Sequence, residues 1–175
     1  MKKTISLLLV VTTLLFSANT QAQQDKSKRP SPPATVKQTI KSGATISINY
    51  SQPSLKGRTI GKDIEPMEGQ VWRTGANEAT VFETDKALTI NDKTLPAGKY
   101  ALFSISGKDS WTIIFNKNWD QWGAYNYKEG DDVLRIKVVP QKTETSSEIL
   151  TFTIDLNGGI QLRWGNYMIS FTVAS

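Results

Sequence analysis

The sequence contains no cysteine and no histidine. The chain therefore cannot build a histidine-dependent serine triad, a cysteine–histidine pair, or the thiolate and imidazole ligand sets of most zinc and copper sites. It also cannot form a disulfide, and it lacks the cysteine on which a bacterial lipid anchor is attached. The side chains that remain for chemistry are carboxylates, amides, cations and aromatic rings.

Long apolar runs are missing as well, apart from one near the N-terminus. There Lys2 and Lys3 precede an apolar run over 5–16, and small or polar residues follow as far as Ala22. An apolar core of about 12 residues is shorter than the roughly 20 that a bilayer requires, and this order is typical of a secretory signal peptide. We expect a signal peptide over 1–22, cleavage near Ala22, and a mature protein that is periplasmic or secreted, with no membrane span or lipid anchor.

Excess charge of one sign is small. The net charge is +5 for 175 residues, and two of the basic residues lie in the predicted signal peptide. Three more, Lys26, Lys28 and Arg29, lie in the polar, proline-rich segment 23–34, which we expect to be a flexible arm. The domain itself, expected over 35–175, is nearly neutral, so nucleic-acid binding gains no support.

The dominant period of the chain after residue 35 is two. Apolar and polar residues alternate through 150–156 and again through 160–164 and 167–173, with glycine and asparagine between these segments. Alternation of this kind predicts half-buried strands, and the intervening residues favour tight turns. We therefore expect an all-β chain that forms a single antiparallel β-sandwich, jelly-roll-like or a partly closed barrel, with a C-terminal meander and little helix. Further strands are expected at 45–50, 79–84, 87–90, 99–106, 110–116 and 133–139.

The segment 70–80 is rich in side chains that bind ligands. Trp72, Arg73, Asn77 and Glu78 supply a flat ring, a forked cation, an amide and a carboxylate. This set suits a polar ligand that carries hydroxyl or acidic groups. The alternative is structural: Trp72 closes one end of the sandwich and Arg73 pairs with a carboxylate.

The segment 116–127 interleaves four aromatic residues with amides and carboxylates. Its members include Trp119, Gln121, Trp122 and Tyr125. Sugars present apolar C–H faces to rings and hydroxyls to amides, so the pattern is typical of a carbohydrate-stacking surface. The alternative is a long connection whose rings fold back over the core.

Other charged residues are weaker candidates. Lys56 and Arg58 lie in a turn-rich stretch and could meet an anion, although solvated loop charges are the favoured explanation. The acidic turn that contains Glu129, Asp131 and Asp132 departs from the spacing of an EF-hand, so we assign no metal site and no cofactor.

Four motifs resemble the domain of unknown function 2911. They are YSQPSLKGR from residue 50, VWRTGANEAT from residue 71, LPAGKYALF from residue 95 and QWGAY from residue 121. The resemblance extends from about residue 30 to the C-terminus, and it implies an exported protein of Bacteroidetes-type bacteria with no established reaction. Gln52 departs from the arginine that the family often has before the proline. The family's marked positions correspond here to Trp72, Arg73, Asn77, Glu78, Trp122 and Tyr125.

These observations predict a non-catalytic binding or accessory module for a glycan or small polar ligand. The expected ligand-binding residues are Trp72, Arg73, Asn77, Glu78, Gln121, Trp122 and Tyr125, with Lys56, Arg58 and Trp119 as secondary candidates. One alternative is a hydrolase of envelope glycans or peptides that uses Glu78 or an aspartate as general base. A second alternative is a structural or protein-binding domain, which would bury the aromatic residues of the motifs.

Overall fold

The computed structural model describes residues 25–175, so the predicted signal peptide lies outside the described residues. Within this range the regular secondary structure is antiparallel strand, apart from two short 3-10 turns, η1 (Lys26–Lys28) and η2 (Glu129–Asp131), and loops connect the strands. None of its helical segments is long and apolar enough to cross a membrane. The strands are β1 (Pro33–Thr39), β2 (Thr45–Ser51), β3 (Val71–Trp72), β4 (Val81–Thr84), β5 (Leu88–Ile90), β6 (Lys93–Leu95), β7 (Gly98–Ile105), β8 (Trp111–Asn116), β9 (Asp132–Val138), β10 (Gln141–Ile154) and β11 (Gly159–Thr172).

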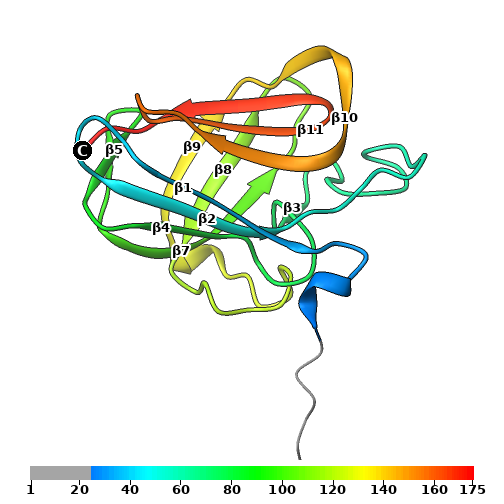
Figure 1. Ribbon diagram of the computed structural model, residues 1–175, viewed down its shortest axis with the longest axis horizontal. Coiled ribbons are helices and arrows are strands. Elements are labelled where there is room, and N and C mark those ends of the chain that lie inside the picture. The colour runs from blue at the N-terminus through cyan, green and yellow to red at the C-terminus, as the bar shows by residue number, and fades with distance from the viewer. Residues whose placement is uncertain (1–24) are drawn as a thin grey trace, which may run out of the picture.

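The strands form two layers (Figure 1). The larger sheet has the order β1-β2-β4-β7-β8-β9, and β3 pairs with β7 beyond the end of β4. The long hairpin β10–β11 lies across one face of this sheet, and the short hairpin β5–β6 lies at one end. The prediction of an all-β antiparallel sandwich with little helix is therefore confirmed.

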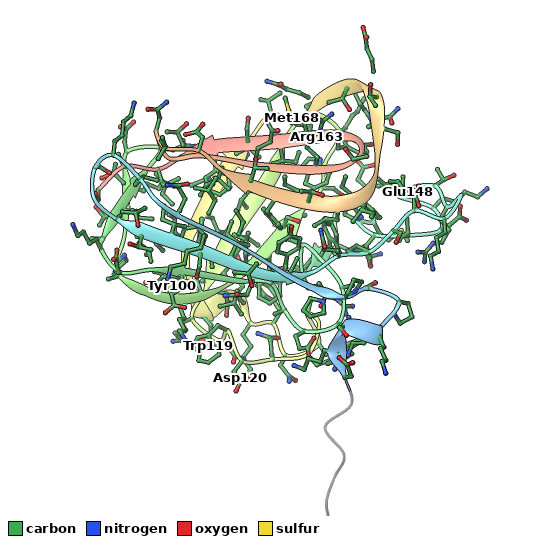
Figure 2. The ribbon with its side chains drawn as sticks, in the orientation of Figure 1. Tyr100, Trp119, Asp120, Glu148, Arg163 and Met168 are labelled. Atoms are coloured by element: carbon green, nitrogen blue, oxygen red, sulfur yellow. The ribbon has the colours of Figure 1, made fainter. Side chains whose placement is uncertain are left out.

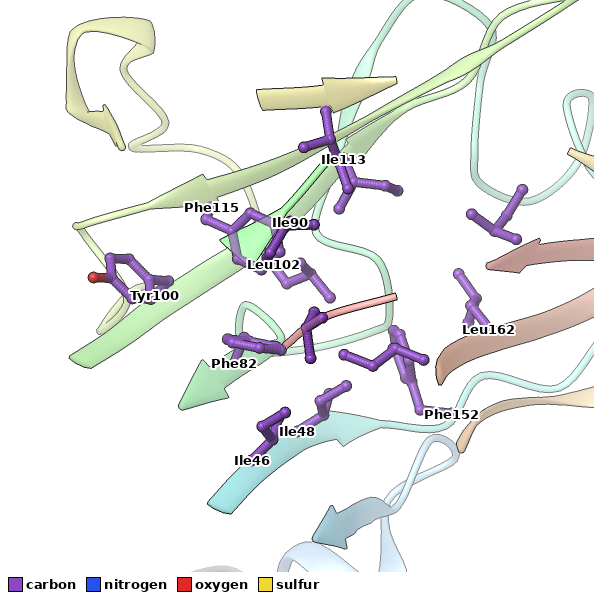
Figure 3. Close-up of a cluster of buried hydrophobic side chains, with 14 of the residues drawn as sticks. Ile46, Ile48, Phe82, Ile90, Tyr100, Leu102, Ile113, Phe115, Phe152 and Leu162 are labelled. Carbon is purple, nitrogen blue, oxygen red and sulfur yellow. The ribbon is translucent and has the colours of Figure 1, made fainter. Parts of the chain in front are cut away.

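The core lies between the large sheet and the β10–β11 hairpin. Every second residue of β2, including Ile46 and Ile48, is buried, as the period of two predicts. Figure 3 shows these side chains facing Phe152 and Leu162 of the hairpin. Tyr50 joins the two layers, because its ring contacts that of Phe152 at 4.9 Å between centroids and its hydroxyl accepts a hydrogen bond from the Phe152 amide at 3.2 Å.

The predicted C-terminal meander is corrected to a two-stranded hairpin. The chain does not turn at Gly165 but continues through it as β11, with Gly165 paired to Ser147 of β10. The register of β10 shifts on both sides of Ser147, so Gly165, at φ 55°, lies in an irregular, bulged part of the ladder. A Cβ at this position would also lie 2.6 Å from the Cδ1 of Ile60, so close packing explains the glycine.

The segment before the first strand lies against the domain. β1 begins at Pro33, inside the range expected to be a flexible arm, and pairs with β2 along its whole length. The described residues before it run past the loop between β3 and β4, to which they are joined by contacts of Lys26, Arg29 and Ser31.

Candidate functional site

Trp72 is a structural residue at the start of the candidate site. Its side chain is only 2% exposed, and it contacts Trp111 with 6.5 Å between ring centroids. Its indole N–H donates to the carbonyl of Gly75 at 3.1 Å, which ties the 73–80 loop to the end of β3. Trp72 therefore holds this loop in place and presents little surface to a ligand.

The 73–80 loop is folded by backbone turns that need unusual conformations. Thr74 and Asn77 have positive φ values of 52° and 57°. The Thr74 hydroxyl contacts that of Ser104 at 3.0 Å, and Thr80 donates to the Thr74 carbonyl at 3.0 Å, both in the interior. These bonds hold the loop in one shape and leave Arg73 at its outer side.

Arg73 is held by the main chain and not by a carboxylate. Its Nη1 donates to the carbonyl of Asn77 at 2.9 Å. Among residues 25–175, no carboxylate lies within ion-pair distance of its guanidinium. The remaining N–H groups of Arg73 are thus directed by the fold without being neutralised by a charge partner.

Glu78 instead pairs with two cations of the segment before β1. Lys26 Nζ lies 2.9 Å from its carboxylate, and Arg29 Nη1 donates to both carboxylate oxygens at 3.0 Å. Partial burial acts to raise the pKa of Glu78, but the hydrogen bonds from Lys26 and Arg29 outweigh burial and lower the pKa to about 2. A carboxylate with this pKa is a weak general base at neutral pH.

The two segments singled out in the sequence lie side by side. The amide of Ala79 donates to the carbonyl of Gln121 at 3.0 Å, and the amide of Gly123 donates to that of Asn77 at 3.0 Å. Glu78 and Trp122 face each other in this short antiparallel pairing. The structure therefore brings the seven primary candidates into one region at one end of the sandwich.

Buried polar residues fix both ends of the 117–131 loop. Asn116 is fully buried, and its amide donates to the carbonyl of Lys128 at 3.0 Å and to Asp132 at 2.7 Å. Asp132 also accepts hydrogen bonds from Tyr127 and Arg135, at 2.7 and 2.6 Å. The loop is thus closed at its base by a connected network, which limits the conformations that its tip can adopt.

Three rings of this loop are exposed, and we call them the aromatic surface: Trp119, Trp122 and Tyr125. Their exposed fractions are 39%, 49% and 80%. Lys99 Nζ lies 5.2 Å from the centroid of Trp119, and the Arg29 guanidinium lies 5.9 Å from that of Trp122. Figure 2 shows Trp119 at the outer edge of the molecule. Gln121, by contrast, is buried, and its amide donates to the carbonyl of Asn118.

A small cavity of about 210 Å³ adjoins the 73–80 loop. Arg58, Glu65 and Arg73 are the charged residues that line it. Arg58 Nε and Nη2 donate to the carbonyls of Leu55 and Ser54 at 3.0 and 2.7 Å, so its guanidinium is anchored by main chain. The neighbouring Lys56 is exposed and does not line this cavity.

The carboxylates of the acidic turn are engaged by two cations, Lys117 and Arg135. Glu129 and Asp132 each pair with Arg135, at 3.1 and 2.6 Å, and Asp131 pairs with Lys117 at 3.2 Å. No cluster of three potential metal-ligating side chains occurs in the described part of the chain.

Three residues of the site were not predicted from the sequence. Lys26 and Arg29 reach it from a segment that composition alone describes as a polar arm, and no local signal predicts their pairing with the distant Glu78. Gly123, with φ 64°, lies between Arg73 and Tyr125, whose atoms would stand 3.3 and 3.2 Å from a Cβ at this position. In the sequence, only the place of this glycine between Trp122 and Ala124 in the QWGAY motif marks it as part of the site.

Residues 31–173 match the model of a family described as a protein of unknown function, DUF2911. Because this match covers most of the chain, the chain belongs to that family, and the resemblance noted in its motifs is confirmed. No curated protein and no solved structure matches the chain.

Proposed function

We propose that this member of the DUF2911 family is a non-catalytic module that binds a glycan at the aromatic surface, in the periplasm or outside the cell. The observation that carries the proposal is the exposure of Trp119, Trp122 and Tyr125 on a single loop. Large rings are costly to leave in water, and exposed groups of them are characteristic of interaction surfaces. Ring faces also complement the C–H faces of a sugar.

The support for a preformed surface comes from the base of the loop. Asn116 and Asp132 hold its two ends, and the hydrogen bond from Gly123 to Asn77 holds its middle against the 73–80 loop. Binding to a surface that is already ordered loses less conformational entropy than binding to a mobile loop. Arg73 adds directional N–H donors close to the ring of Tyr125, which suits the hydroxyl groups of a sugar.

The hydrolase alternative has less support. Glu78, its named general base, is engaged by Lys26 and Arg29, and its pKa of about 2 is far from the neutral range in which a general base is effective. We therefore favour binding without catalysis.

The proposal is tested by screening the protein on a glycan array and measuring the affinities of the best ligands by calorimetry. Trp122→Ala and Tyr125→Ala should each weaken binding roughly threefold to tenfold, since each removes one stacking contact. Leu156→Ala is the matched control, because Leu156 is an exposed apolar residue of the β10–β11 turn. The proposal fails if no glycan binds, or if the control weakens binding as much as the two ring variants do.

A further inference from the structure

We infer that the ligand carries a carboxylate, and that the cavity between Arg58 and Arg73 is the subsite for it. This inference rests on the proposed function and names its substrate class: an acidic sugar, such as a uronic acid, within a glycan. It is carried by two arginines that line one small cavity and whose guanidinium groups are both oriented by main-chain carbonyls.

Neither arginine of the cavity has a carboxylate partner among residues 25–175. In the part of the chain that the structure describes, the ion pairs of Arg29 and Arg135 use Glu78, Glu129 and Asp132, and neither Arg58 nor Arg73 joins one. An arginine fork matches the two oxygens of a carboxylate, and charge-assisted hydrogen bonds of this kind are about twice as strong as neutral ones. Two such forks on one cavity therefore favour an anionic group.

The size of the cavity indicates that it takes one part of a ligand. Pockets that enclose a whole drug-sized molecule measure about 300–1,000 Å³, whereas this cavity measures about 210 Å³. The rest of the ligand must lie outside it.

Arg73 connects this cavity to the aromatic surface. It lines the cavity, and its guanidinium carbon also lies 3.3 Å from the position of a Cβ at Gly123, where the ring of Tyr125 approaches to 3.2 Å. A ligand whose carboxylate meets Arg73 therefore has an aromatic ring close by, on which its sugar ring can stack.

Glu65 decides between an acidic sugar and a simple inorganic anion. Glu65 also lines the cavity, and its carboxylate accepts a hydrogen bond from the amide of Met67 at 2.6 Å. A compact dianion would be repelled by this carboxylate. A uronic acid carries one negative charge, which can pair with the arginines, and hydroxyl groups, which can donate hydrogen bonds to Glu65.

The test compares pairs of sugars that differ only in this carboxylate. Calorimetric titrations of the protein would use galacturonate and galactose disaccharides of one linkage, the corresponding glucuronate and glucose disaccharides, and sulfate alone. The acidic member of at least one pair should bind about tenfold more tightly than its neutral partner, as expected for a hydrogen-bonded charge pair. Arg58→Gln and Arg73→Gln should each remove this preference.

Lys62→Gln provides the matched control, because it deletes one positive charge from the loop that holds Arg58, at an exposed position that does not line the cavity. It should leave the preference intact, and thermal unfolding should show that all three variants fold.

Equal affinity for both members of every pair would overturn the inference while the proposed function stands. Sulfate that binds as tightly as the acidic sugars would overturn the choice of ligand class. A further outcome is that Arg58→Gln and Arg73→Gln remove the preference for the acidic sugar, while Trp122→Ala and Tyr125→Ala bind the sugars with unchanged affinity. This outcome would support the subsite and refute the stacking surface. Absence of binding by all sugars would refute both.

Discussion

Arg29 and Glu78 form a two-point contact in which one guanidinium nitrogen donates to both carboxylate oxygens at 3.0 Å. Arg29 also lies over the ring of Trp122, and the neighbouring Ser31 accepts a hydrogen bond from Asn77 through its carbonyl. The residues that precede β1 thus contact three of the candidate ligand-binding residues. The chain's own N-terminal segment is therefore part of the environment of the aromatic surface.

This contact predicts an acid-sensitive change at Trp122. The pKa of Glu78 is lowered to about 2 from its ordinary value of 4.5. A lowered pKa in the folded state means that the pairing contributes fully above the ordinary pKa and is lost as the pH falls through about 2. In a pH titration followed by NMR, the indole N–H signal of Trp122 should hold its position through mildly acidic pH and shift only as the pH approaches 2.

Glu78→Gln supplies the control for this titration. Because the variant lacks the carboxylate, its Trp122 signal should stand near the acid-shifted position at every pH. Glu83→Gln, which removes a carboxylate paired with Lys99, should leave the Trp122 titration unchanged. A midpoint near the ordinary pKa of a glutamate would contradict the pairing.

The base of the 117–131 loop yields a prediction about stability. Asn116→Ala removes the amide that bonds to Lys128 and Asp132, and also the oxygen that accepts from the amide of Asn118 at 2.9 Å. Because the amide of Asn118 and the Oδ1 of Asp132 lose their partner in a partly buried setting, the free energy of unfolding should fall by roughly 1–3 kcal/mol. Asn126→Ala, at an exposed asparagine of the same loop, should change it by less than about 0.5 kcal/mol. Denaturant unfolding of the two variants measures the difference, and equal stabilities would show that the network does not hold the loop.

Periodicity was sufficient to predict most of the sandwich. The alternation of apolar and polar residues in β2 and in the second half of β10 predicts which residues face the core. A strand with one face in the core and the other in solvent must alternate in this way, because successive side chains point to opposite faces. It failed at Gly165, where glycine and asparagine together resemble a turn. Some bulges and many hairpin turns place a residue at positive φ, as Gly165 is here, so the local sequence does not separate the two. The pairing with the partner strand does.

The site was predictable as a set of residue types but not as a geometry. Trp122 and Tyr125 are exposed as a stacking surface requires, whereas Trp72, in a motif just as rich, is buried against Trp111. Which ring is covered depends on contacts between strands far apart in the chain. The same holds for Glu78, whose two cationic partners lie about fifty positions away.

Gly123 offers a sharp test of how Arg73 and Tyr125 are placed. At φ 64°, an alanine would be strained by roughly 1–2 kcal/mol. Its Cβ would also stand 3.3 Å from the Arg73 guanidinium carbon and 3.2 Å from the Tyr125 ring, so these side chains would have to move apart. Gly123→Ala should therefore lower the free energy of unfolding by at least about 1 kcal/mol. It should also weaken glycan binding, since the cation and the ring would no longer meet one ligand together.

Gly130→Ala is the matched control in the same loop: no atom lies within 4 Å of its Cβ position, and the change should be neutral or slightly stabilising. Unfolding curves and titrations in which the two variants coincide would show that Gly123 does not set the spacing of Arg73 and Tyr125.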